Sequence, residues 1–100
     1  MVKHIILWQL KESISAEEKI NVKKNIKNAL ESLQGVIPGL IEIKVQIDSL
    51  ESSNADLMLD STFENFDSLK AYAIHPAHVA AADNAVRSFT QTRLCLDFEI

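Results

Sequence analysis

Hydrophobic residues recur along this chain with a period that changes several times, and each period predicts a different element. Residues 2–10, VKHIILWQL, are apolar at both sets of alternate positions, which is typical of a strand covered on both faces. Residues 40–48, LIEIKVQID, are apolar at every second position and polar between, which predicts a strand with one apolar face. Residues 56–63, DLMLDSTF, and residues 93–100, RLCLDFEI, predict two more strands.

A long helix is predicted between the first two strands. It begins at the sequence SAEE, a capping box in which the Ser15 side chain can cap the helix and Glu18 can reach back to it. Gly35 and the Pro38-Gly39 pair end it. The apolar residues between these limits recur at helical spacing: Val22, Ile26, Ala29, Leu30 and Leu33.

Two shorter helices are predicted between the last two strands, separated by a break at Pro76. Residues 65–74, NFDSLKAYAI, have a capping Asn65, and residues 76–89, PAHVAAADNAVRSF, form the second helix. Proline has no N–H and a fixed φ, so it suits the first turn of a helix and disfavours helical geometry at the preceding His75. The chain should therefore turn a corner here.

The resulting order, β-α-β-β-α(α)-β, predicts an α+β fold of the ferredoxin-like type in a single domain, residues 1–100. Right-handed crossovers place the helices on one face of a four-stranded antiparallel sheet and leave the other face bare. A second copy of the chain is the simplest cover for such a face, so we expect a homodimer through the sheet face, a dimeric α+β barrel. Either alternating face of residues 40–48 could meet the partner.

Composition narrows the class of protein further. Hydrophobic residues make up 47% of the 100 positions, more than a small monomer usually needs. The net charge of −4 argues against nucleic acid or an anionic membrane as the main partner. The single cysteine, Cys95, excludes an internal disulfide, and no leader or membrane-spanning run is recognisable, so a cytoplasmic location is expected.

The corner itself carries the candidate chemistry, in the segment YAIHPAHVA. His78 lies in the first turn of the new helix, where the helix dipole disfavours an imidazolium and favours a neutral ring that accepts a proton. Tyr72 lies one turn before the break and could approach it, and a Tyr–His pair is competent for proton transfer. The alternative is structural: His75 caps a helix end and His78 braces the corner.

Other candidate residues add little chemistry. Trp8 shares a strand face with His4 and is more often core than a stacking platform. The histidines together with Asp56 or Asp60 lack the spacing of metal ligands, so no metal or other cofactor is expected.

Five segments, taken in order, resemble the stress-responsive A/B barrel (Dabb) domain family over essentially the whole chain: VKHIILWQLKE, IPG, STFEN, YAIHPAHVA and LDFE. The resemblance implies a ferredoxin-like protomer and a dimeric barrel, and it implies little about activity. A plant polyketide cyclase in the family works without a cofactor, and similarity to it implies Tyr72 and His78 as a catalytic pair. It also implies His4 as a pocket residue, to which we add His75 and Trp8 as ligand-binding candidates. Leu57 stands where that cyclase has a further histidine.

Two functions follow as hypotheses. The first is a dimeric barrel of unassigned activity that holds a small apolar or carbonyl ligand between sheet and helices. The alternative is a cofactor-independent cyclase, lyase or isomerase that acts on a polyketide-like carbonyl compound through Tyr72 and His78. Convergence of His4, Tyr72 and His78 on a cavity would favour the second, and apolar side chains filling that space would count against it.

Overall fold

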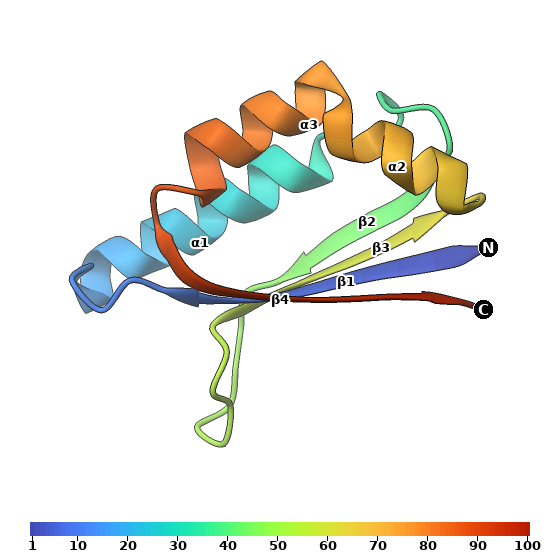
Figure 1. Ribbon diagram of the computed structural model, residues 1–100. Helices are drawn as coiled ribbons and strands as arrows, with labels where there is room; N and C mark the ends of the chain where they lie inside the picture. The colour runs from blue at the N-terminus through green and yellow to red at the C-terminus, as the bar shows by residue number, and fades with distance from the viewer.

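The computed structural model describes residues 1–100 as one layer of helices on one layer of sheet (Figure 1). The four strands are antiparallel, in the order β2-β3-β1-β4, and the helices all lie on one side of them, as the sequence predicted. In chain order the elements are β1 (Val2–Leu10), α1 (Ala16–Glu31), β2 (Leu40–Gln46), β3 (Leu57–Phe63), α2 (Phe66–Ile74), α3 (Pro76–Ala81), the π-helical turn η1 (Ala82–Val86) and β4 (Thr90–Glu99).

The core lies between the sheet and α1. Alternate residues of the central strand β1, among them Ile6, Trp8 and Leu10, face the helices and are buried. Ile26 and Leu30 of α1 meet them from above. The predicted N-terminus of α1 is confirmed, because the Ser15 hydroxyl accepts a hydrogen bond from the N–H of Glu18.

The apolar face of β2 belongs to this core. Ile43 and Val45 are each 2% exposed and lie among the buried residues of the helix-facing side. Of the two faces that the sequence left open, the apolar one therefore packs under the helices. The outer edge of β2 is also closed by α1: the Val45 N–H donates to Glu31 Oε2 at 2.9 Å, and Lys27 Nζ donates to the Val45 carbonyl at 2.8 Å.

The corner at Pro76 forms as predicted, but the helix after it is shorter than predicted. His75 has extended backbone angles, φ −65° and ψ 132°, and α3 starts at Pro76. The sequence predicts one helix over residues 76–89, whereas α3 passes into the π-helical turn η1 at Ala82. Such wider turns are common at functional sites, and Ala82 and Val86 of this one line a cavity.

The other side of the sheet is bare. Ile5, Leu7, Met58, Leu94, Leu96 and Phe98 share it, and we call this surface the open face. Leu94 and Leu96 are both 63% exposed, whereas the helix-facing residues of the adjacent strand β1 are buried. The β2–β3 loop, residues 47–56, projects beyond the sheet on the side away from the helices (Figure 1). None of the helices has the length and apolar character needed to cross a membrane.

Candidate functional site

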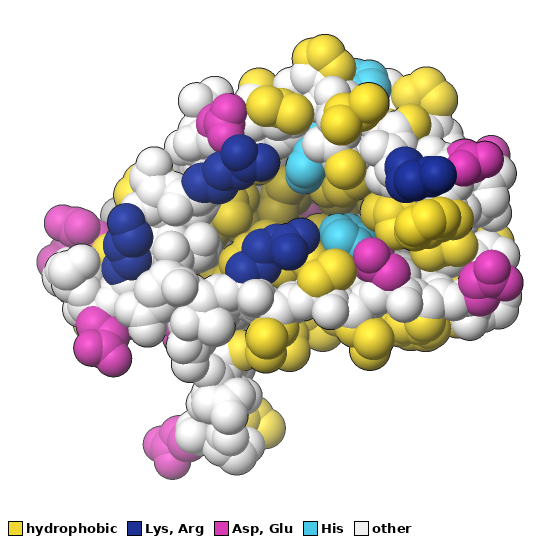
Figure 2. Space-filling view, in the orientation of Figure 1, with side chains coloured by type: hydrophobic (Ala, Val, Ile, Leu, Met, Phe, Trp, Pro, Cys, Tyr) yellow, Lys and Arg dark blue, Asp and Glu magenta, His cyan; other side chains and the backbone are white.

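A cavity of about 260 Å³ lies between the helix-facing side of the sheet and the helical layer. Figure 2 shows it as a hollow with an apolar interior, with histidine and basic side chains around its mouth. A second hollow of about 290 Å³ adjoins it and shares His4, Tyr72, His78 and Arg93 with it. The first is lined by His4, Ile6, Trp8, Leu30, Leu59, Tyr72, His78, Ala82, Val86, Arg87, Thr90 and Arg93. The structure thus brings four of the five expected site residues together.

Tyr72 is placed by α2 and lies against the sheet. Its ring centroid lies 4.2 Å from that of His78, 4.9 Å from that of Phe63 and 6.1 Å from that of His4. The residue is 1% exposed, and its hydroxyl has no hydrogen-bond partner. Burial raises the pKa of Tyr72 well above its usual value, against a smaller opposing effect of the Arg93 charge. The phenol therefore stays protonated and has a free O–H to donate.

His78 is placed by α3, and the corner fixes its tautomer. Its Nδ1 lies 3.2 Å from the carbonyl oxygen of Ala73 in α2. Because a carbonyl only accepts, Nδ1 carries the proton and Nε2 keeps its lone pair. Burial lowers the pKa of His78, and the charges of Arg87, His4 and Arg93 act in the same direction, outweighing the bond to Ala73. His78 is therefore neutral at pH 7 and able to accept a proton. It braces the corner as well as lining the cavity.

His4 is held from the neighbouring strand by Asp97, which the sequence did not indicate as a site residue. The two residues are direct cross-strand partners in the β1–β4 register, and His4 Nδ1 lies 2.5 Å from Asp97 Oδ1. A carboxylate in this position orients the ring and leaves Nε2 as the nitrogen available to a ligand. The sequence shows Asp97 only as one of the polar positions of an alternating strand, and the register is what gives it His4 as a partner.

Cys95 completes a small cluster beside His4. Its Sγ lies 3.8 Å from His4 Nδ1 and 3.5 Å from Asp97 Oδ1, and the ligand atoms of the three residues lie within 4.8 Å of one another. A nitrogen, a sulfur and an oxygen in this arrangement could hold a divalent metal ion. The spacing argument did not find the cluster because it forms between strands. Burial raises the pKa of the Cys95 thiol, and the Asp97 charge adds to this, so the thiol donates to that carboxylate.

His75 lies outside the cavity. Its Nδ1 accepts a hydrogen bond from the N–H of Ala77 at 3.1 Å and so caps the start of α3. The ring does not line either hollow. The position of His75 is therefore the one given by the structural alternative, a cap at the start of a helix.

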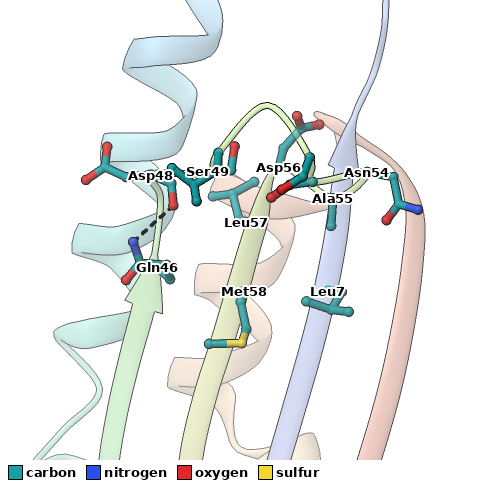
Figure 3. Close-up of a pocket in the computed structure, with 12 residues that line it drawn as sticks. Leu7, Gln46, Asp48, Ser49, Asn54, Ala55, Asp56, Leu57 and Met58 are labelled. Carbon is teal, nitrogen blue, oxygen red and sulfur yellow. Dashed lines mark hydrogen bonds between the residues drawn. The ribbon is translucent and has the colours of Figure 1, made fainter.

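A third hollow, of about 460 Å³, lies on the opposite side of the sheet. Figure 3 shows Leu7 and Met58 on neighbouring strands of the open face, with the β2–β3 loop at their ends. The loop is tied to β1, since Asp56 Oδ2 accepts from the N–H of Leu10 at 2.7 Å. This hollow contains neither histidine nor cysteine, whereas the cavity under the helices contains both His4 and His78.

The sequence profile of the stress-responsive A/B barrel domain matches residues 2–100. The chain belongs to the Dabb family. Among the family's relatives, olivetolic acid cyclase of Cannabis sativa is 29% identical over 100 residues, which span 97% of this chain and 94% of the cyclase.

Solved structures agree with the Dabb assignment. A protein of Bacteroides fragilis, described as dimeric, ferredoxin-like and of unknown function, is 35% identical and has a TM-score of 0.92 over 99% of this chain and 95% of that one. A hydroxynitrile lyase of Passiflora edulis has a TM-score of 0.73 at 18% identity over 99% of this chain and 92% of that one, which shows a shared fold alone.

Proposed function

We propose that this Dabb protein is a homodimer that binds a small, largely apolar carbonyl or phenolic compound in the cavity under its helices. The unpaired hydroxyl of Tyr72 is the observation that carries the proposal. A buried polar group without a partner costs roughly 1–3 kcal/mol, so it is retained most readily where a ligand supplies the missing hydrogen bond. The apolar lining residues would contact the rest of the ligand.

Binding can be followed through Trp8, because it is the one tryptophan of the chain and lines the cavity. Titration with medium-chain ketones and alkylphenols should change its fluorescence in the wild-type protein. Tyr72→Phe should weaken ketone binding by about tenfold, the usual effect of removing a hydrogen bond to a buried ligand oxygen. Equal affinity of the two proteins for every ketone would refute the role of the hydroxyl.

The dimer is supported by the open face and by relatives. Leu7, Leu94, Leu96 and Phe98 of this face are exposed, whereas β1 and β3 bury the residues of their helix-facing side. Structural relatives from Bacteroides fragilis and Thermobifida fusca are both described as dimeric. A second copy related by a twofold axis would cover both open faces at once. Sedimentation at micromolar concentration should show one species of twice 11.2 kDa.

The second candidate is a cofactor-independent cyclase, lyase or isomerase, and the Tyr72–His78 geometry favours it. Nε2 of His78 would remove a proton from a carbon beside a carbonyl group, while the Tyr72 hydroxyl donates to the carbonyl oxygen as charge develops there. The enolate could then attack a second carbonyl of the same chain, and the proton would return to the product. The related cyclase makes this reaction class a reasonable one to test.

Proton abstraction can be tested without the natural substrate. Exchange of the α-protons of a simple β-diketone into D₂O, followed by NMR, should be faster with the wild-type protein than with His78→Gln. Tyr72→Phe should impair the same step without full additivity in the double variant, as expected for residues acting as a unit. Identical exchange rates with wild type and His78→Gln would leave ligand binding as the function and end the catalytic proposal.

A further inference from the structure

We propose that the cavity selects ligands that carry a carboxylate, and that Arg93 binds this group. The inference deepens the proposed ligand-binding function and rests on it. It names the chemical class of the ligand and adds a residue that neither the sequence motif nor the comparisons indicate.

The position of Arg93 is the first argument. It lies on β4 directly opposite Trp8 of β1, on the helix-facing side of the sheet. It lines both the inner cavity and the adjoining hollow, so its side chain stands where the two meet.

The absence of a carboxylate partner within the chain is the second argument. Arg87, the other arginine of the cavity, is held by Asp83 at 3.0 Å on the preceding turn. Arg93 takes part in no salt bridge, although six are formed elsewhere in the chain. A guanidinium at the mouth of an enclosed site, with no carboxylate of its own, is available to one brought by a ligand.

The charge of the whole cavity is the third argument. Its inner lining contains two arginines and two histidines and no acidic residue. The adjoining hollow adds one carboxylate, Asp97, which already accepts from His4 and Cys95. The chain as a whole carries a net charge of −4, so this is a local positive site on an acidic protein. The fields of Arg87 and Arg93 also reach the His78 ring.

The apolar residues of the lining indicate the chemistry of the rest of the ligand. The apolar floor of the cavity consists of Ile6, Trp8, Leu30, Leu59 and Val86. A planar guanidinium binds a carboxylate through two parallel hydrogen bonds, and an apolar chain or ring attached to that group would lie on the floor. The ligand class is therefore a small monocarboxylate with an apolar body.

Octanoate and octanamide form a matched pair of probes, since they differ mainly in the charge of the head group. Titrated below micellar concentration and followed by Trp8 fluorescence, octanoate should bind the wild-type protein about tenfold more tightly than octanamide. Arg93→Gln should remove this preference by weakening octanoate binding much more than octanamide binding, and Arg93→Lys should retain part of the preference. Lys24→Gln, which removes an exposed cation of α1 away from the cavity, should have no effect. Circular dichroism of each variant checks that the fold is kept.

The binding results distinguish failure of the carboxylate preference from failure of the ligand-binding function. Equal binding of octanoate and octanamide, or a preference that survives in Arg93→Gln, would overturn the carboxylate inference while the ligand-binding function stands. Binding of octyl phosphate in preference to octanoate would overturn the assignment of the head group. If neither octanoate nor octanamide binds the wild-type protein at millimolar concentration, the proposed function itself fails for this class of ligand, and the inference fails with it.

Discussion

The ring of Tyr72 lies 4.2 Å, centroid to centroid, from the ring of His78, and the Tyr72 hydroxyl is buried without a hydrogen-bond partner. The two residues come from helices on either side of the Pro76 break, so the corner of the chain is what brings them together. Stability and function should therefore respond differently when each side chain is changed.

Tyr72→Phe should leave the protein as stable as the wild type, or slightly more stable. The variant keeps the buried ring and removes only an oxygen that has no partner, so no hydrogen bond is lost and an uncompensated desolvation is relieved. Thermal unfolding followed by circular dichroism measures this directly. A fall in melting temperature of several degrees would show that the hydroxyl has a structural partner.

His78 should make stability depend on pH in a defined window. Its pKa is lowered in the folded protein, so the unfolded chain binds the proton first. The stability that neutral His78 contributes is fully present above the pKa of the unfolded chain, about 6.5. It is lost as the pH falls below that pKa toward the lower pKa of the folded protein. The difference between wild type and His78→Gln isolates the effect of this one side chain. The variant should lose less stability between pH 7 and pH 5, and parallel curves would contradict the assignment of a neutral His78.

His78→Gln should also lower stability at pH 7, because the bond from Nδ1 to the Ala73 carbonyl joins α2 to α3. We expect a loss of about 1 kcal/mol in the free energy of unfolding, the usual contribution of one partly exposed hydrogen bond. Urea unfolding at pH 7 gives this value in the same series. An unchanged midpoint would mean that the corner does not depend on this brace.

Gly39 and Gly35 offer a matched test of packing at the turn before β2. Both have positive φ, 82° and 83° respectively, so alanine costs about 1–2 kcal/mol at either position. A Cβ on Gly39 would also collide with the side chain of Ser68 in α2, whereas one on Gly35 would meet nothing. Gly39→Ala should therefore be clearly more destabilising than Gly35→Ala in urea unfolding. The double change Gly39→Ala with Ser68→Gly should recover the difference, and equal losses in the two single variants would exclude the clash.

The two faces of the sheet should respond differently to a new charge. Leu96→Asp places a carboxylate on the open face, where the side chain is already exposed, so the protomer should remain folded and the dimer should dissociate. Ile43→Asp places the same group in the core under α1 and should unfold the chain, because an unpaired charge there has no partner. Sedimentation and circular dichroism of both variants separate these results. A Leu96→Asp protein that is still dimeric would exclude the open face as the interface.

Most of the secondary structure was predictable because it depends on neighbours in the chain. The alternation in residues 2–10, the Ser15 cap and the Pro76 break act over one to four residues, and all three appear in the structure as expected. The prediction of one continuous helix over residues 76–89 was wrong. The chain widens into a π-helical turn at Ala82, and Ala82 and Val86 of this turn line the cavity. Local propensity favours helix here and does not distinguish the two kinds of turn.

The sequence by itself determined the order of the elements and the corner at Pro76, because each follows from φ, ψ and residue spacing. It allowed an approach of Tyr72 to His78, which the structure shows at a centroid distance of 4.2 Å. The tertiary structure alone decided which face of β2 is buried, which strand residue holds His4, and that Arg93 reaches the cavity. The last two depend on the register of β1 with β4, in which His4 faces Asp97, a residue 93 positions away in the sequence. Strand register is set by packing against the helices, and alternation within one strand gives two faces without saying which one the helices cover.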